Sequence, residues 1–271
     1  MGRHKTLADE LSTLAWSKAV EIATGGMTPK RIEITFMPEC VKWVGGQLDR
    51  PRLMDRYSSG ATTIKGTNSR CGGVGLVERV EAVYPGTAIW FQHPLWNFLQ
   101  PKPLAMEDIH RWMLQLQGKF VRRFFSENDN DGALVRNYFT IPADVKDIAR
   151  NEQSLDAFTF LVGIVQESEI RVDMQNHYCA CIGMRKLFPI IAELPQMTSI
   201  SGRLFDYIEA RFFKVIYRIP PDGEEMRFTQ SWRDTFPELA KNYPDTPDKQ
   251  DKNKWRAILK TIPQEGSDKE S

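Results

Sequence analysis

The residues with the clearest chemical potential are five cations in the glycine-rich segment 45–75. Arginine and lysine side chains in a mobile segment can neutralise the phosphates of a nucleic-acid backbone without reading its sequence. The segment holds seven of the chain's eighteen glycines and only two carboxylates, and its cations are Arg50, Arg52, Arg56, Lys65 and Arg70. Structureless loops longer than about 12–15 residues are uncommon in compact domains and are usually functional or disordered. We therefore expect 45–75 to be a long basic loop that contacts nucleic acid.

Aromatic residues that follow this loop predict a second kind of contact. Exposed aromatic rings beside a basic groove stack on bases, which contributes about 1–3 kcal/mol per base. The candidates are Trp90 and Trp96. The alternative is that these rings belong to the hydrophobic core, which is the commoner place for such a segment. Further along, an amphipathic helix carries Lys119, Arg122 and Arg123, which extend the basic surface unless they are only its solvated face.

An arginine and a histidine supply a catalytic alternative. Arg171 and His177 are the first and last residues of the stretch RVDMQNH. This spacing resembles the R-x(4–6)-H motif of the HEPN ribonucleases, which are helical and cleave RNA without a metal. The resemblance implies that His177 is the general acid or base and that Arg171 stabilises the charge of the phosphorane. It also implies an exposed cleft, although the helix expected here is apolar on several sides.

Metal sites are not expected. In a helix Cys179 points away from the face shared by His177 and Cys181, and a zinc site needs paired ligands at a suitable spacing. A calcium-like stretch begins with Glu127 in place of Asp, and Tyr138 stands at its twelfth position, where a bidentate Glu is required. The glycines form no nucleotide-binding motif. The sequence therefore predicts neither a metal nor a cofactor.

Three regions are expected to position these residues. Residues 1–100 read as α+β, with a first helix capped by Thr6 and ended by two glycines. The alternation of Ile32, Ile34 and Phe36 predicts a half-buried strand, and Trp43 is expected to continue the sheet. After the loop, residues 76–91 predict a hairpin because they are rich in β-branched and aromatic residues.

The second region, residues 101–221, is expected to be a helical bundle. Apolar residues at helical spacing predict helices over about 105–125, 154–166, 168–194 and 201–219. Residues 222–271 read as a polar C-terminal region with one short helix near Trp255 and a disordered end. The predicted fold class is α+β: a small antiparallel or mixed sheet with a long basic loop, followed by a predominantly α-helical bundle.

Composition narrows the class of function. The chain of 271 residues is 41% hydrophobic and 26% charged, which is ordinary for a soluble protein. A net charge of +1 excludes a uniformly basic protein, so any nucleic-acid surface must be local. Four cysteines favour a reducing cytosol, and no apolar stretch predicts a membrane span. We expect a non-catalytic, cytoplasmic subunit of a larger complex that binds the backbone of DNA or RNA; the alternatives are the ribonuclease and a protein–protein scaffold.

Overall fold

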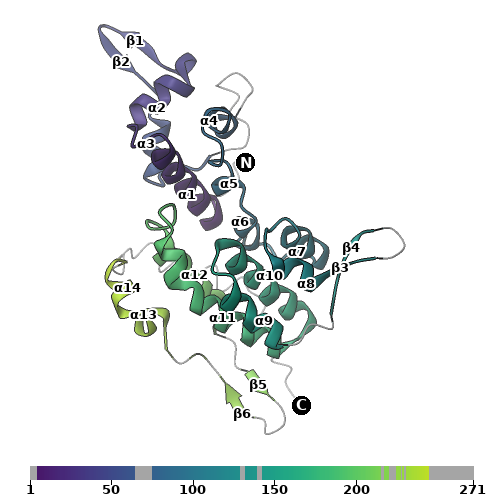
Figure 1. The fold of residues 1–271 in the computed structure, drawn as a ribbon. Helices are drawn as coiled ribbons and strands as arrows, with labels where there is room; N and C mark the ends of the chain where they lie inside the picture. The colour runs from purple at the N-terminus through teal and green to yellow at the C-terminus, as the bar shows by residue number, and fades with distance from the viewer. Residues whose placement is uncertain are drawn as a thin grey trace, which may run out of the picture.

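The computed structural model describes residues 5–64, 75–128, 132–138, 142–214, 217–219, 224–226, 228 and 230–243. Within these residues the chain is mainly helical and carries three two-stranded antiparallel sheets (Figure 1). This agrees with the coarse prediction of an α+β, mostly helical protein, but separate two-stranded sheets replace the single N-terminal sheet that was predicted. The short C-terminal helix predicted near Trp255 lies outside the described residues.

The first helix, α1 (Leu7–Ala23), begins as the sequence predicts. The Thr6 side chain accepts a hydrogen bond from the backbone N–H of Asp9, and the Asp9 carboxylate accepts one from the backbone N–H of Thr6, which is a capping box. The buried residues of α1 belong to two hydrophobic clusters. Its first half contributes to the larger cluster and its second half to the smaller, through Ala8, Leu11 and Ala15 and through Trp16 and Val20 respectively.

The strand predicted from Ile32, Ile34 and Phe36 is wrong, because the structure has a helix there, α2 (Pro29–Phe36). Ile32 and Phe36 are four residues apart, so they fit one helix face as well as one strand face, and both are buried. Ile34 is 42% exposed. The Thr28 side chain caps the helix and a proline occupies its first turn. These end signals favour the helix over the alternation.

The predicted loop 45–75 contains regular structure in its first part. After a single turn of 3-10 helix (Pro38–Cys40), β1 (Lys42–Val44) pairs with β2 (Gln47–Asp49), and α3 (Leu53–Ser58) follows. Gly45 and Gly46 join the strands with φ of 56° and 78°, the positive angles that a tight two-residue hairpin turn requires. The prediction of a structureless loop is therefore wrong for 45–58, whereas 59–64 carry neither helix nor strand. Residues 65–74 lie outside the described part.

The hairpin predicted over 76–91 is also wrong. The structure has α4 (Leu76–Val83) and α5 (Ile89–Gln92), followed by α6 (Leu95–Phe98). The turn between the first two is held by Glu81, whose carboxylate accepts from the backbone N–H groups of Gly86 and Ala88 at 2.7 and 2.6 Å. Packing of one α4 face into the smaller cluster outweighs the strand propensity of its valines.

The helix predicted over 105–125 is divided into α7 (Met106–Met113) and α8 (Lys119–Phe124). Gly118 stands at the break. A Cβ atom there would lie 2.2 Å from the Phe120 ring, so only glycine fits this close approach. The rest of the helical region was predicted with errors mainly at helix ends, except that its first helix, over 142–151, was not predicted. It comprises α9 (Pro142–Asn151), α10 (Leu155–Arg171), α11 (Met174–Glu193) and α12 (Ser201–Phe212).

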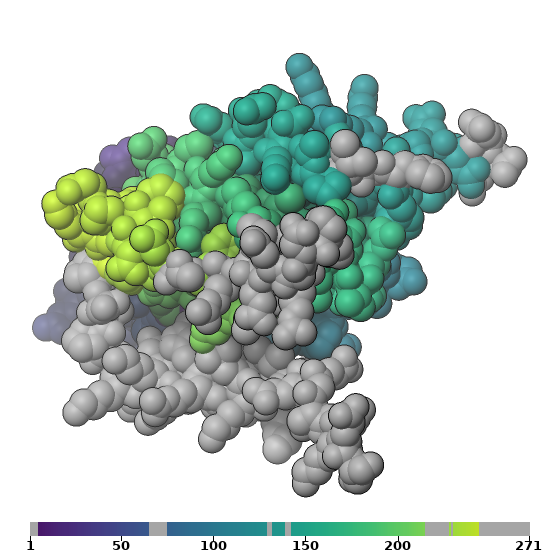
Figure 2. All heavy atoms as spheres, turned by 90° about the horizontal axis from the view of Figure 1, so that it is seen from below, coloured from purple at the N-terminus to yellow at the C-terminus, as the bar shows by residue number. Residues whose placement is uncertain are grey.

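Two further hairpins and two short helices complete the structure. The pair β3 (Phe125–Glu127) and β4 (Leu134–Arg136) projects beside α8 (Figure 1). The strand β5 (Tyr217–Ile219) occupies the end of the last predicted helix, 201–219. It pairs with β6 (Glu224–Met226), which lies in the predicted polar C-terminal region. The short helices α13 (Trp232–Thr235) and α14 (Pro237–Lys241) cover α12 from outside and appear in yellow in Figure 2.

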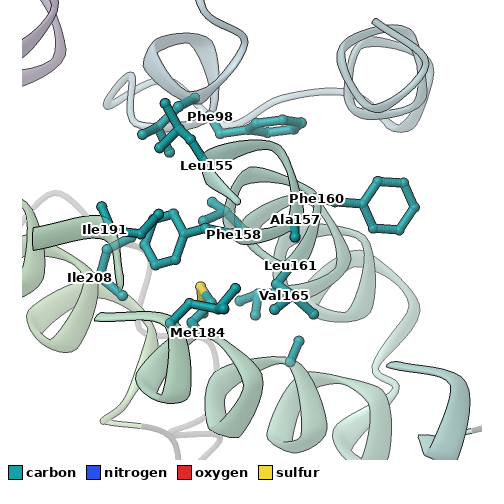
Figure 3. Packing of buried hydrophobic residues seen from close by; sticks show 14 of the residues in the cluster. Phe98, Leu155, Ala157, Phe158, Phe160, Leu161, Val165, Met184, Ile191 and Ile208 are labelled. Atoms are coloured by element: carbon teal, nitrogen blue, oxygen red, sulfur yellow. The ribbon is translucent and has the colours of Figure 1, made fainter. Parts of the chain in front are cut away.

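The larger cluster is centred on α10 and α11, which pack side by side and are joined by a two-residue turn. Figure 3 shows side chains of this cluster from α6, α10, α11 and α12 meeting in one interior. The Phe188 ring stacks on Phe205 with centroids 4.1 Å apart. Among the described helices, none has the length and apolar character needed to cross a membrane.

Candidate nucleic-acid interface

Four exposed cations lie on two short helices that pack against each other, α2 and α3. They are Lys30 and Arg31 at the start of α2, and Arg52 and Arg56 around α3. We call these four residues the basic surface. None of them forms an ion pair with a carboxylate within the described part of the chain; Arg56 donates only to the backbone oxygen of Pro51, at 3.1 Å. Their charges are therefore available to an external anion.

Arg50 was predicted to contact phosphate, but the structure uses its charge internally. Its Nη1 atom lies 3.0 Å from Glu33 and 2.5 Å from Asp55, and its side chain is only 16% exposed. The hydrogen bond from Arg50 is the main cause that lowers the pKa of Asp55. Since two carboxylates already occupy its guanidinium, Arg50 supports the neighbouring cations and is not itself a free one.

The buried carboxylate of Glu33 holds the side chain of Arg50 and the backbone of Met54, one on each side of Arg52 in the chain. One of its oxygens accepts from Arg50 and the other accepts from the backbone N–H of Met54 at 2.8 Å. Between these two anchors Arg52 has φ of 51°, a left-handed conformation that non-glycine residues rarely adopt. Such a conformation persists only where the surroundings enforce it. Here they enforce a conformation in which the Arg52 side chain is exposed.

An exposed aromatic residue lies close to these cations in the chain, on the β1–β2 hairpin. Trp43 is 74% exposed and its neighbour Val44 is 61% exposed. Figure 1 shows the hairpin projecting from the end of the molecule that carries α2. Across the hairpin, Lys42 stands opposite Asp49. Trp43 is thus an aromatic ring in solvent, of the kind that can stack on a base.

The two tryptophans predicted to stack occupy other positions. Trp96 is 4% exposed and its Nε1 atom donates to the backbone oxygen of Trp90 at 2.8 Å. Trp90 is half-buried and packs against both hydrophobic clusters. The prediction for Trp96 is corrected by its burial, because a ring inside the core cannot meet a base. The core interpretation of this segment was the right one for Trp96.

The cations predicted on the helix after residue 105 do not extend the basic surface. Figure 1 shows α8 far from α2 and α3. Arg123 pairs with Asp144 and lies 3.8 Å from Asp147. With Lys119 it lines a cleft of about 500 Å³ that also contains three carboxylates, Asp144, Asp147 and Glu152. Arg122 is exposed beside them. Because carboxylates outnumber cations in this cleft, it does not favour a phosphate backbone.

Arg171 and His177, the two residues of the ribonuclease resemblance, contact different parts of the structure. His177 is 2% exposed; its Nε2 atom lies 3.7 Å from Glu169 and its Nδ1 atom 3.7 Å from Cys181. Arg171 is exposed and lies over the ring of Tyr138. A buried imidazole cannot reach a substrate at the surface. His177 therefore does not line an exposed cleft of the kind that the ribonuclease motif needs.

Two cysteines of α11 lie in the hydrophobic core. Cys179 and Cys181 are 4% and 0% exposed, and burial raises the pKa of the Cys179 thiol. Within the described part of the chain no group of three or more His, Cys, Asp or Glu side chains is arranged to hold a metal ion.

Sequence reasoning found two of the four cations of the basic surface and missed Lys30, Arg31 and Trp43. A signal for Lys30 and Arg31 was present, since Thr28 followed by a proline is a typical helix start. No signal could have shown the exposure of Trp43, because exposure depends on which elements pack over the hairpin. Comparison of the chain with known proteins found no family model, no curated protein and no solved structure that matches it.

Proposed function

We propose that the protein is a non-catalytic, cytoplasmic subunit of a nucleoprotein assembly that binds the phosphate backbone of nucleic acid. The observation that carries this proposal is the basic surface: Arg52 and Arg56 are exposed without carboxylate partners in the described part of the chain, and α3 packs against α2, which carries the exposed Lys30 and Arg31. Cations of this kind bind phosphates by releasing counterions, which gives affinity without sequence preference.

The exposed Trp43 supports single-stranded nucleic acid as the preferred form. Unstacked bases can lie on an aromatic ring, whereas bases in a duplex are already stacked on their neighbours. The hairpin presents this ring 74% exposed and next in sequence to the segment that carries Arg52. A flexible single strand can contact both the ring and the cations. We therefore expect tighter binding to single strands than to duplexes of the same length.

The test is fluorescence anisotropy with short labelled single- and double-stranded DNA and RNA at low salt. The test variant replaces Arg31, Arg52 and Arg56 with glutamine. The control variant replaces Lys102, Arg111 and Arg150, three exposed cations elsewhere, so that both variants lose the same charge. We expect at least about a tenfold loss of affinity in the first and less than about a twofold loss in the second. No binding by the parent protein, or equal losses in both variants, contradicts the proposal.

Exposed apolar side chains favour a second function, the docking of a protein partner. Trp43 and Val44 on one hairpin, and Leu134 and Val135 on another, are between 46% and 74% exposed. Contiguous exposed apolar residues often mark an interaction site. The replacement Trp43→Ala separates the two functions: unchanged nucleic-acid affinity in this variant assigns the β1–β2 hairpin to a protein partner.

A further inference from the structure

A second group of polar side chains meets at the base of the β3–β4 hairpin. His110 belongs to α7, Tyr138 follows β4, and Arg171 is the last residue of α10. The Tyr138 ring connects them. The guanidinium carbon of Arg171 lies 3.9 Å from the centre of this ring, and the centre of the His110 ring lies 6.2 Å from it. Three elements thus bring an imidazole, a phenol and a cation to one place.

A buried ion pair lies beneath this group. The carboxylate of Glu167 accepts from Nε and Nη2 of Arg136, at 3.1 and 2.9 Å. The two side chains are 3% and 4% exposed. Arg136 also donates to the backbone oxygen of Phe124 at 3.2 Å, and its guanidinium carbon lies 5.4 Å from the centre of the Tyr138 ring. The charges of Glu167 and Arg136 neutralise each other, and Arg136 packs against the Tyr138 ring. This ion pair therefore does not neutralise the positive charge of Arg171.

Glu167 also fixes which nitrogen of His110 carries a proton. Its other oxygen lies 3.2 Å from Nε2 of His110. Burial acts to raise the pKa of Glu167, but the hydrogen bond from His110 and the charge of Arg136 outweigh it, and the pKa is lowered. The carboxylate is therefore ionised and only accepts, so Nε2 must donate. Nδ1 is left without a partner among the described residues, and the His110 side chain is 19% exposed.

Tyr138 and Arg171 supply the donors of the group. Tyr138 is 45% exposed, and partial burial followed by the charge of Glu167 raises its pKa, so the phenol keeps its proton at neutral pH. Arg171 is exposed, and within the described part of the chain no carboxylate pairs with it. Because its guanidinium lies over the ring, its N–H groups remain available. Guanidinium N–H groups match the oxygens of phosphate particularly well.

We propose that His110, Tyr138 and Arg171 bind the phosphate group of a phosphate monoester. The Arg171 guanidinium and the Tyr138 hydroxyl donate to the phosphate oxygens, while Nδ1 of His110, which carries no proton when Nε2 donates to Glu167, accepts from a protonated phosphate oxygen. Glu107, an exposed carboxylate on α7 whose charge acts on Tyr138, offsets part of the positive charge of Arg171. A phosphate monoester in its monoanionic form has a hydroxyl that can donate to Nδ1 of His110, whereas a diester has none, so the site favours the monoester. The site therefore differs in ligand class from the basic surface, which meets phosphodiesters, and it stands independently of the proposed function.

Isothermal titration calorimetry at constant ionic strength tests this site. The probes are inorganic phosphate, a nucleoside 5′-monophosphate and a dinucleoside phosphodiester. The variants are Arg171→Gln and Tyr138→Phe, with Arg150→Gln as the control because the Arg150 side chain is 81% exposed on α9. We expect the parent to bind phosphate and the monoester more tightly than the diester, and Arg171→Gln to weaken both about tenfold. We expect Tyr138→Phe to weaken them severalfold and Arg150→Gln to leave them unchanged.

Nitrogen-15 spectra of the histidine rings locate the ligand directly, since the chain has four histidines. Inorganic phosphate should shift the Nδ1 resonance of His110. Absence of phosphate binding, a shift confined to another histidine, or equal affinity in Arg171→Gln and the parent overturns the proposal. The glutamine variant of Arg31, Arg52 and Arg56 should bind inorganic phosphate like the parent, so failure here and failure of nucleic-acid binding are separate results.

Discussion

At the scale of single residues, Arg52 affects both the stability of the fold and the proposed binding of nucleic acid. Its φ of 51° is favourable for glycine and costs an arginine of order 1–3 kcal/mol. Glu33 holds the neighbouring chain on both sides, through the side chain of Arg50 and through the backbone N–H of Met54. The fold thus spends stability to expose a positive charge, which is typical of a functional position.

This predicts that Arg52→Gly separates the two properties. Glycine removes the strain, so the free energy of unfolding should stay equal or rise by up to about 1 kcal/mol in urea titrations. The lost charge should weaken nucleic-acid binding severalfold. Arg56→Gln serves as the control, because it removes a charge from α3 without changing a strained angle. A clearly destabilised Arg52→Gly protein, or one with unchanged affinity, contradicts this account of Arg52.

The buried carboxylate of Glu167 makes a prediction about pH. Its folded-state pKa is lowered below the ordinary value of 4.5, so its stabilisation is complete above that value and is lost as pH falls below it. Glu167→Gln leaves Arg136 buried without its counter-charge, which costs about 3–5 kcal/mol at pH 7. The difference in the free energy of unfolding between Glu167→Gln and the parent should become smaller as pH falls through the folded-state pKa of Glu167.

Urea titrations between pH 7 and pH 3.5 measure this difference in unfolding free energy. The contributions of carboxylates that both proteins share cancel in the difference. Glu127→Gln is the control, because Glu127 is exposed on β3. A gap between Glu167→Gln and the parent that stays constant over this range would show that the ion pair does not stabilise the fold as described.

At the scale of elements, end signals were more informative than propensity. The cap at Thr6 predicted α1, and the apolar spacing predicted α10 to α12 with errors mainly at their ends. The strand over 32–36 and the hairpin over 76–91 were wrong, because β-branched residues on one face of a short helix look like alternating strand residues. Tertiary packing decided between the two, and a single sequence does not contain that packing.

The candidate site was only partly predictable for the same reason. The exposure of Arg56 followed from its place in a polar segment, and the structure agrees. The pairing of Arg50 with Glu33 depends on the contact between α2 and α3, which no local pattern encodes. His110, Tyr138 and Arg171 come from three separate elements, so their meeting at the surface could not be anticipated either.

The β1–β2 hairpin should act as a binding element that the core does not need. Its side chains from Lys42 to Gln47 are exposed, so Trp43→Ala should change the free energy of unfolding by less than about 0.5 kcal/mol. The same variant should lose about 1–3 kcal/mol of binding to single strands and almost none to duplexes. Anisotropy measures the binding and urea titration the stability. An equal loss for single strands and duplexes would exclude stacking as the role of Trp43.

At the scale of the whole molecule, α1 connects two hydrophobic clusters, and the two candidate sites lie on different ones. The basic surface belongs to helices around the smaller cluster, whereas His110, Tyr138 and Arg171 lie on the helical part. The ion pair between Arg203 of α12 and Glu10 of α1, at 2.7 Å, holds the first half of α1 on the larger cluster. Because the net charge is only +1, binding of nucleic acid depends on where the cations are concentrated on the surface.

The dependence of nucleic-acid affinity on salt is therefore the most direct test. For single strands, the slope of log K against log salt falls by about 0.7 for each phosphate contact that is lost. Replacing Arg31, Arg52 and Arg56 with glutamine should flatten the slope by about 2, while replacing Lys102, Arg111 and Arg150 should leave it unchanged. Identical slopes in the parent and in both variants would show that the basic surface does not contact the phosphate backbone.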